Sequence, residues 1–573
     1  MSKLDWIVLS ITLIAIITYG LYKSRTSKNL EGYFLSNRSM PWYLVLLSIM
    51  GTQASAITFI SAPGQAFTDG MRFVQYYFGL PIAMVILCIT FVPLFSKQKV
   101  FTAYEYLEKR FDVKTRTFTA FLFLLSRGLS TGISIYAPSI ILSSLMGWDI
   151  FTTNIVMGGL LIIYTVSGGA KAVAYTQQLQ LGIIFIAMFI AGYMVVHLLP
   201  EGIGFSDALA ISGANGKMNI ITTGFTEKGF DWKDKYNIVS GVIGGFFLAL
   251  SYFGTDQSQV GRYLTAKDNT ESRLGLLMNG LVKVPMQFLI LLVGVLLFSF
   301  YQFKEQPIFF NSAQDQKLLI SEKRDSALAL QQQYQQLNAE KQIVFKNYKS
   351  NEVVAQQELK NLNHTSDSLK KVYKGLFKTG NIKGDDNDTN YIFLRFVVDY
   401  LPKGLVGLLI AIIFLAAWGS IAAALNSLAS CTMIDFHKRF TKQTVIIDEV
   451  KHNEREYKLS KMYTLFWGIF CIIVAQLVVG MGSLIEAVNV LGSLFYGVIL
   501  GIFLVGFYMK RIQGNAVFIG AIIGELVTIL LFILDKNGTI GLGFLWLNVV
   551  GALLVVVLSW VIQFVQGNFT SSK

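Results

Sequence analysis

Two stretches of this sequence combine glycine with small polar residues inside otherwise apolar segments. One lies at residues 51–58, reads Gly-Thr-Gln-Ala-Ser-Ala-Ile-Thr, and is followed by Ser-Ala-Pro-Gly at 61–64. The other lies at 241–257 and ends in Ser-Tyr-Phe-Gly-Thr-Asp-Gln. Glycine and proline interrupt membrane helices and free backbone carbonyl groups, which can then bind a polar solute or a small cation. Because glycine also serves helix packing alone, the two stretches are informative mainly as a matched pair.

A third stretch places small residues on one helix face. Ala416, Gly419 and Ser420 stand at i, i+3 and i+4, which is the spacing of neighbours on a helix surface. A backbone carbonyl and a hydroxyl on that face could complete an oxygen shell for a small hard cation. Small residues are equally typical of close helix contacts, so the pattern alone leaves both interpretations open.

Few ionisable residues lie within the apolar segments, where a charge is costly and usually faces a cavity or a partner. They are Arg127, Lys283, Glu486 and Glu525. Lys283 lies well inside its segment and is the most suggestive of a functional contact. Glu486 is close to a segment end, which favours solvation. Asp256 is followed closely by Arg262, and we expect a structural ion pair there at least as much as a ligand role.

Other chemistry finds no support in the sequence. No nucleophile–base arrangement, phosphate-binding loop or metal-ligand spacing stands out, so we predict that the protein is not an enzyme. The three cysteines all lie in apolar runs, which argues against a disulfide framework or a metal cluster. The net charge of +13 could suggest nucleic acid. In a membrane protein, however, excess Lys and Arg is first a topology signal, and we predict no nucleic-acid partner.

The composition is that of a polytopic all-α membrane protein. The 573 residues are 53% hydrophobic and only 14% charged, whereas a soluble domain carries about 25% charged residues. This excludes a soluble enzyme, a disulfide scaffold and a disordered protein. About 20 apolar residues cross the hydrocarbon core, and that window predicts about thirteen spans. They are expected at 4–22, 42–67, 74–96, 117–145, 150–167, 178–199, 237–257, 275–302, 404–434, 459–481, 484–508, 516–534 and 543–565.

The connectors give the orientation. Lys and Arg gather in the loops after the odd-numbered spans and are nearly absent from the short loops on the other side. The positive-inside rule therefore places the N-terminus outside and the C-terminus in the cytoplasm, as an odd number of spans requires. The first span is not a cleavable signal, because its positive residues follow the apolar run. We expect a multi-pass protein of the plasma (inner) membrane.

The two glycine-containing breaks lie five spans apart, which is the spacing of two inverted five-helix repeats. The expected division is a first helix and cytoplasmic loop at 1–41, a first repeat at 42–199, a second repeat at 237–302 and 391–508, and C-terminal helices at 509–573.

Residues 303–390 are polar, but their spaced apolar positions predict two helices that form an extracytoplasmic hairpin with its turn near Asn351. Residues 380–388 are read as a flexible exit. The hairpin is either a solvated insertion without chemistry or a docking site for a protein partner.

Several blocks of the sequence resemble the sodium:solute symporters, whose members carry sugars, proline, monocarboxylates, vitamins, iodide or sialic acid. The blocks are EGYFLSNRSMPW at 31–42, SAPG at 61–64, YAP at 136–138, YTVSGGAKAV at 164–173, TDQSQVGRYLTAK at 255–267 and NSLASCTMID at 426–435. In order and spacing they cover nearly the whole chain except 303–390. The resemblance implies a ten-helix inverted-repeat transporter in the lipid bilayer that works by alternating access. It also implies Na⁺ as the coupling ion and no organic cofactor.

The resemblance places one sodium ion between the broken second span and the ninth span. The residues carried over are the carbonyls of Gly51, Ala54 and Ala416 and the side-chain positions Gly419 and Ser420. The family usually has hydroxyls at both side-chain positions, and many members have an aspartate where this chain has Gln177. A lost hydroxyl and a lost charge both weaken a hard-cation site. A sodium-coupled symporter and an uncoupled or proton-driven facilitator are therefore both open.

The resemblance also carries over a solute pocket. Its positions are Gln53, Thr58, Tyr77, Ala249, Phe253, Lys283 and Asn489, and Tyr252 matches the aromatic residue that closes the inner side. Thr58, Tyr77 and Ala249 supply fewer hydrogen bonds than sugar-carrying members use, and each unmet buried partner costs roughly 1–3 kcal/mol. With one cationic group, the pocket suits a carboxylate-bearing or small amphipathic solute as well as a sugar.

A third hypothesis is a solute sensor that signals through the hairpin. Signalling members of this fold usually append a cytoplasmic domain, whereas this sequence ends at Lys573, a few residues after the last expected span.

Overall fold

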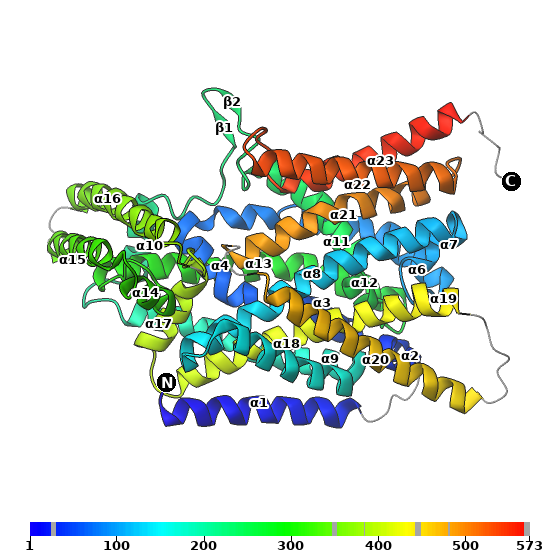
Figure 1. Cartoon of the computed structure of the whole chain (residues 1–573), viewed down its shortest axis with the longest axis horizontal. Coiled ribbons are helices and arrows are strands. Elements are labelled where there is room, and N and C mark those ends of the chain that lie inside the picture. Colours follow the sequence, from blue (N-terminus) through cyan, green and yellow to red (C-terminus); the bar gives the residue numbers. More distant parts are fainter. Residues whose placement is uncertain (25–29, 347–351, 383, 442–448, 479–481, 567–573) are drawn as a thin grey trace.

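The computed structural model describes residues 1–24, 30–346, 352–382, 384–441, 449–478 and 482–566, and it is a helical bundle whose long helices run nearly parallel (Figure 1). The long helices are α1 Lys3–Ser24, α8 Val113–Met146, α9 Ile150–His197, α13 Asn269–Phe303, α18 Leu405–Cys431, α20 Glu449–Ala475, α21 Leu484–Tyr508, α22 Gly514–Lys536 and α23 Leu545–Val565. The shorter helices of the bundle are α2 Leu30–Leu35, α3 Trp42–Gln53, α4 Ala56–Asp69, α5 Leu80–Ile86, α6 Val92–Gln98, α7 Glu105–Arg110, α10 Phe205–Ala214, α11 Gly245–Thr255, α12 Gln257–Tyr263, α17 Ile392–Tyr400 and α19 Lys438–Phe440.

Tight and wide helical turns and one small hairpin complete the bundle. The 3₁₀ turns are η1 Ser36–Arg38, η2 Met71–Tyr77 and η6 Thr389–Tyr391, and the π turns are η3 Leu87–Phe91, η4 Ser240–Gly244 and η7 Thr432–His437. The strands β1 Phe225–Thr226 and β2 Gly229–Phe230 pair antiparallel.

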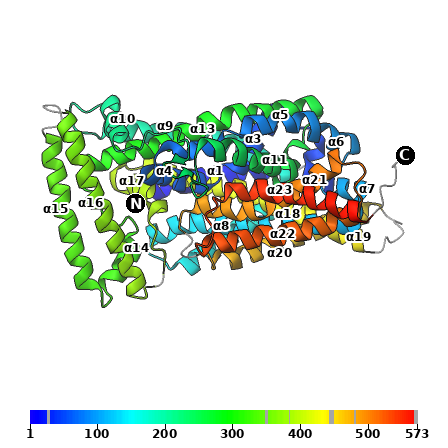
Figure 2. The same ribbon diagram turned by 90° about the horizontal axis from the view of Figure 1, so that it is seen from above.

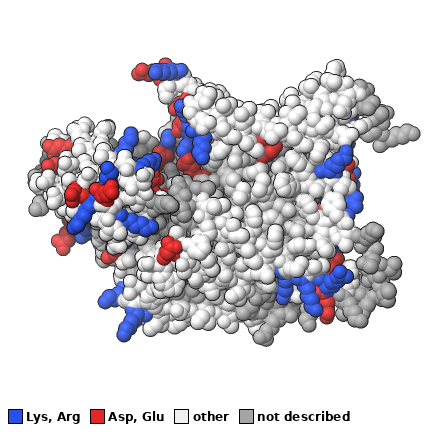
Figure 3. Space-filling view, viewed as in Figure 1, with Lys and Arg blue, Asp and Glu red and all other residues white. Residues whose placement is uncertain are grey.

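The number of spans is roughly consistent with the predicted thirteen. Among the described residues, ten helices are long and apolar enough to cross a membrane, or eleven if the bent pair α3 and α4 counts as one span. Two shorter apolar helices, Ile150–Val166 and Ser240–Thr255, lie where the sequence predicts two further spans. Charged side chains collect at the two ends of the molecule and leave the middle nearly free of charge (Figure 3), as a bilayer requires. Helix α1 begins at one end and α23 finishes at the other (Figure 1).

Aspartate residues begin three of the long helices. The side chains of Asp112, Asp149 and Asp268 accept hydrogen bonds from backbone N–H groups of the first turn, at 2.8, 2.9 and 3.0 Å. The first four N–H groups of a helix have no partner within the helix, so a side-chain oxygen at this position satisfies one of them. These caps fix where α8, α9 and α13 start.

Helix α9 contains the fifth and sixth predicted spans. Its backbone is helical over 48 residues, from Ile150 to His197. The hydroxyl oxygens of Tyr164 and Thr176 are nevertheless 2.7 Å apart. Twelve residues of straight helix would separate their backbones by about 18 Å, so α9 must bend sharply between these two residues. Its two arms lie at the positions of the fifth and sixth predicted spans, and Val173–His197 is long and apolar enough to cross a membrane.

Both predicted helix breaks are present. Helices α3 and α4 meet at an angle of 61° across Ala54 and Ser55. Helices α11 and α12 are separated at Asp256, whose backbone is extended with φ −77° and ψ 116°. The division of the chain into two inverted repeats at the boundaries given above stays a prediction.

The polar insertion forms the predicted helical hairpin. It consists of α14 Ser312–Leu319, α15 Arg324–Lys346 and α16 Glu352–Thr379, and α15 and α16 lie side by side across one end of the bundle (Figure 2). A small core of its own, including Tyr334, Tyr373 and Phe377, holds the hairpin together. The predicted turn at Asn351 lies outside the described residues.

The hairpin is docked on the bundle. The Gln342 amide donates to the carbonyl of Phe303 at 3.1 Å, and the Asn363 amide donates to Asn215 at 2.8 Å. At the exit, Asp388 accepts from the backbone N–H of Phe310 at 2.9 Å. These contacts hold the insertion against the transmembrane part of the molecule.

Candidate functional site

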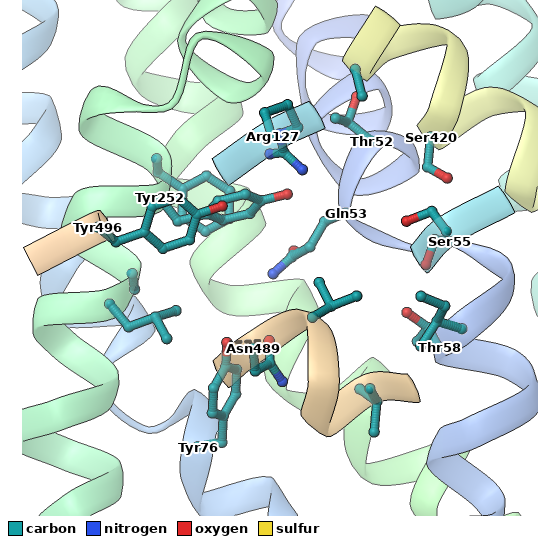
Figure 4. A pocket seen from close by; sticks show the side chains of 18 of the residues that line it. Thr52, Gln53, Ser55, Thr58, Tyr76, Arg127, Tyr252, Ser420, Asn489 and Tyr496 are labelled. Carbon is teal, nitrogen blue, oxygen red and sulfur yellow. Dashed lines mark hydrogen bonds between the residues drawn. The ribbon is translucent and has the colours of Figure 1, made fainter. Parts of the chain in front are cut away.

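A cavity lies inside the bundle where the two broken helices come together (Figure 4). It is lined by residues of α3, α4, η2, α8, α11, α18 and α21. Most positions predicted from the sequence line it, namely Gln53, Thr58, Tyr77, Ala249, Tyr252, Phe253, Ser420 and Asn489. The Gln53 side chain extends into the middle of the view, and its amide oxygen is buried without a hydrogen-bond partner. A bound solute can therefore donate to Gln53 without displacing a protein bond.

Several polar lining residues are not indicated by the sequence. Tyr76 donates through its hydroxyl to the Asn489 side-chain oxygen at 3.0 Å, which holds that amide in place (Figure 4). Thr131 and Ser134 of α8 and Tyr496 of α21 also face the cavity. None of them stands in a motif, because single hydroxyl residues are common in membrane helices. Only the packing of α8 and α21 against the broken helices brings them to the cavity.

A buried ion pair lies on one side of the cavity. The Arg127 guanidinium contacts the Asp256 carboxylate at 2.6 Å, and the Tyr496 hydroxyl donates to the same carboxylate at 3.0 Å. The Arg127 guanidinium also lies 5.4 Å from the ring centre of Tyr252. This network joins α8, α21 and the break between α11 and α12. Asp256 is thus neutralised by Arg127.

The predicted pairing of Asp256 with Arg262 is wrong. Asp256 caps α12, accepting from the backbone N–H of Ser258 at 2.8 Å, and its carboxylate turns back into the bundle. Arg262 lies six residues later, about 9 Å along the helix and on another face. Two of its guanidinium nitrogens are buried without a partner. Glu486, in contrast, forms the solvent-accessible ion pair that its place at a helix end favours, with Lys235.

Lys283 does not line the cavity. Its side chain is 0% exposed, and its ammonium group lies 5.5 Å from the ring centre of Tyr77, which does line the cavity. Within the part of the chain that the structure describes, the ammonium has no hydrogen-bond partner. An unpaired buried charge is costly, so Lys283 is a group that an anionic solute can stabilise.

The break between α3 and α4 places backbone oxygens beside α18. Carbonyls in the last turn of a helix lack partners within the helix, and those of Gly51 and Ala54 flank this break. The Ser420 hydroxyl donates only to its own helix, to the carbonyl of Ala417 at 3.0 Å, and keeps its lone pairs free. Thr52, Ser55 and Ser420 lie on the same side of the cavity in Figure 4. This set of hard oxygen donors fits a small cation such as Na⁺.

Two glutamines of α9, Gln177 and Gln180, lie against the glycines of the expected cation site, Gly51 and Gly419. The Gln177 amide packs on Gly51, where an added Cβ would lie 2.8 Å from the Gln177 Cβ. Its Nε2 donates to the Gly419 carbonyl at 3.1 Å, and its Oε1 accepts from Ser48 at 3.0 Å. The buried Gln177 amide thus ties α3 to α18 through α9, without a charge.

Gln180 reaches the position that lacks a hydroxyl. Its Oε1 lies 2.5 Å from where a Cβ on Gly419 would stand, while its Nε2 is buried without a partner. A serine at position 419 would place its hydroxyl oxygen in the same small region. The structure therefore offers an amide oxygen from α9 where the chain lacks a hydroxyl on α18.

Comparisons with known proteins agree with this architecture. The family model described as the sodium:solute symporter family matches residues 33–334 and 377–524. The sodium/sialic acid symporter SiaT of Proteus mirabilis (strain HI4320) is 26% identical over 559 residues, covering 97% of this chain and 93% of SiaT. The sodium-coupled monocarboxylate transporter 1 of Xenopus laevis is 24% identical over 529 residues, covering 91% of this chain and 70% of that protein.

A solved structure shows the same fold. It is a Na⁺-coupled sialic acid symporter in a substrate-bound outward-open state, with a TM-score of 0.74 at 23% identity, and the match covers 98% of each chain. The family match contains both broken helices and α18, and it leaves out residues 335–376 of the insertion. The cavity at the junction of the broken helices and the matches over most of the sequence lead to one conclusion: this chain belongs to the sodium:solute symporter family.

Proposed function

We propose that this protein is a secondary active transporter that couples Na⁺ to the uptake of a small carboxylate-bearing solute by alternating access. The observation that carries the proposal is the cavity between the two broken helices, with hard oxygen donors from α3, α4 and α18 on one side. Transporters of this architecture bind the solute and the coupling ion near the middle of the membrane, at the ends of broken helices. Residues Gly51, Ala54, Ala416 and Ser420 are the proposed Na⁺ ligands, with Gln180 in place of a side chain at Gly419.

A carboxylate on the solute is favoured by the charges next to the cavity. Lys283 has no hydrogen-bond or ion-pair partner among the described residues, whereas Arg127 is already paired with Asp256. A neutral solute would leave the Lys283 charge uncompensated, but a carboxylate would neutralise it. Two relatives named above transport sialic acid and monocarboxylates, which both carry this group.

The proposed topology follows the distribution of positive residues. The N-terminus and the insertion lie at one end of the molecule, and we place that end outside the plasma (inner) membrane. The loops that are rich in Lys and Arg then face the cytoplasm, and so does the C-terminus.

Uptake into proteoliposomes tests the proposal. We expect radiolabelled sialic acid or lactate to accumulate above its external concentration when an inward Na⁺ gradient is imposed, and not with an equal choline gradient. Glucose serves as the uncharged comparison solute. If uptake is the same in Na⁺ and in choline, and the internal solute concentration only reaches the external one, the protein is an uncoupled facilitator. A pH gradient that drives accumulation without Na⁺ would establish proton coupling.

The pair Gly419 and Gln180 gives a reciprocal prediction for the Na⁺ site. Gln180→Ala removes the amide oxygen and is expected to weaken Na⁺ binding about tenfold or more, measured as the Na⁺ concentration that half-saturates the rise in melting temperature. Adding Gly419→Ser to this variant supplies a hydroxyl in the vacated space and is expected to restore binding. A matched control is Gln178→Ala on the same helix, which leaves both positions intact. No rescue by Gly419→Ser would contradict the assignment of Gln180.

A further inference from the structure

A second cavity lies between the insertion and the end of the bundle, and we name it the insertion vestibule. It is lined by one face of α16, by the last residues of α4 and α13, and by Asn215, Lys217 and residues 386–388. Its volume is about 790 Å³. Figure 3 shows charged side chains of both signs gathered at this end of the molecule, over the insertion. The vestibule is therefore a large, charged chamber on the face that we place outside.

Positive charge in the vestibule exceeds negative charge. Its described lining contains three aspartates, and each has a lysine partner: Lys370–Asp367 at 3.9 Å, Lys374–Asp388 at 2.5 Å and Lys378–Asp386 at 3.3 Å. Three further lysines line it without an ion pair among the described residues, namely Lys217, Lys360 and Lys371. The described lining therefore holds three more lysines than aspartates, and two of these lysines, Lys360 and Lys371, are exposed to solvent.

Two lysines, Lys341 and Lys217, lie close enough to the lining to be affected by the positive charge of Lys370. Lys341 of α15 is 2% exposed, and burial together with the nearby Lys370 lowers its pKa to about 7. Burial also lowers the pKa of Lys217, while Asp367 and Asp69 raise it and Lys370 adds the smallest contribution, a further lowering. Lysines from three segments of the chain thus surround Asp367, which cannot neutralise them all. An added negative charge would relieve their repulsion.

The vestibule also contains an unused hydrogen-bond donor. Gln306 is 3% exposed and lines the cavity, and its Nε2 is buried without a hydrogen-bond partner. Its backbone carbonyl is held by the Asn338 amide of α15 at 3.0 Å. A buried N–H group without an acceptor costs free energy, and an oxyanion in the vestibule would satisfy it.

One helix joins the vestibule to the central cavity. Phe67 and Thr68, near the end of α4, line the vestibule, and Thr58, near its start, lines the central cavity. The 14 residues of α4 span about 21 Å. Lys217 donates to the carbonyl of Thr68, so a vestibule lysine is fixed directly to this helix. A solute held in the vestibule is one helix length away from the central site.

We propose that the insertion vestibule is a low-affinity capture site for carboxylate-bearing solutes, which raises their local concentration at the outer mouth of the transporter. The proposal rests on the proposed function for its substrate class. Most of its lysines lie on α16, of which residues 352–376 fall outside the family match. A chamber lined by charge of one sign focuses oppositely charged ligands and raises their rate of arrival. The insertion thereby gains a role in recruiting solute.

Equilibrium dialysis of the full-length protein tests the capture site directly. The probe is radiolabelled sialic acid, with glucose as the uncharged comparison, in nonionic detergent without anionic lipid. The background variant Lys283→Gln weakens the central site and leaves the vestibule intact. In this background we expect weak binding of sialic acid at low salt. The binding should be about tenfold weaker in the triple variant Lys217→Gln/Lys360→Gln/Lys371→Gln. It should disappear in 0.5 M KCl, because salt screens the charges.

The matched control is Lys304→Gln/Lys317→Gln/Lys323→Gln, which removes the same charge from lysines that do not line the vestibule. Binding curves that coincide for the two triple variants would overturn the proposal, as would equal binding of glucose. In transport assays, the vestibule triple variant is expected to raise the KM for the anionic solute at low salt. If the vestibule binds sialic acid but the protein transports no solute, only the proposed function is refuted. If uptake is normal but the two triple variants give the same binding curve, only the capture site is refuted.

Discussion

Replacing Ser420 with alanine is expected to abolish the effect of Na⁺ on this protein while leaving it folded. The Ser420 hydroxyl donates only to its own helix, at 3.0 Å to the Ala417 carbonyl, so its removal breaks no contact between helices. It is also the one hydroxyl that α18 offers at the two side-chain positions of the proposed site, because the other is Gly419. A small cation site that loses one of few oxygen ligands loses much of its affinity.

The measurement is the melting temperature of purified protein in NaCl and in choline chloride at equal ionic strength. An ion that binds only the folded state stabilises it by RT ln(1 + [L]/Kd), about 2.7 kcal/mol at one hundred times Kd. We expect a Na⁺-specific rise in the native protein and none in Ser420→Ala. Ser427→Ala is the matched control, since this buried α18 serine also donates to its own helix, to Ala423 at 2.9 Å. An unaltered Na⁺ response in Ser420→Ala would show that the site is elsewhere.

Replacing Lys283 with methionine is expected to move stability and transport in opposite directions. The ammonium is fully buried and has no hydrogen-bond partner among the described residues, so little in the folded state offsets its desolvation cost. Methionine keeps a similar length without the charge, and the free energy of unfolding should rise by more than about 1 kcal/mol. If a solute carboxylate neutralises this charge next to the cavity, as we propose, its loss should cost about 2–5 kcal/mol of solute binding. Uptake of sialic acid should therefore fall by at least about tenfold at concentrations below KM.

Melting temperature and uptake of the same preparations give both readouts. Lys374→Met is the stability control: Lys374 pairs with Asp388 at 2.5 Å, so its removal leaves a buried carboxylate without its partner and should destabilise the protein. A lower melting temperature for Lys283→Met would mean that Lys283 has a structural partner in the membrane. A higher melting temperature with normal uptake would remove Lys283 from the solute site.

The sequence by itself determined the class, the spans and the breaks of this protein. The length of each apolar run is set by the thickness of the hydrocarbon core. Because the residues of a run are contiguous in the sequence, the spans can be found without knowing the tertiary structure. The breaks at 51–58 and 251–257 were visible for the same reason, since glycine acts on the local backbone. The hairpin in 303–390 followed from helical spacing of its apolar residues, as Tyr334 in its core confirms.

The tertiary structure alone decided which side chains meet. Asp256 pairs with Arg127, which is 129 positions away, and not with its neighbour Arg262. Gln180 reaches Gly419 from another helix, and the lysines of α16 face the end of α4. Such contacts depend on helix rotation and packing, which side-chain type and spacing within one segment do not encode. The contact of the Gln180 amide with Gly419 and the insertion vestibule are therefore properties of the packed bundle. The sequence contains their residues but does not show that they meet.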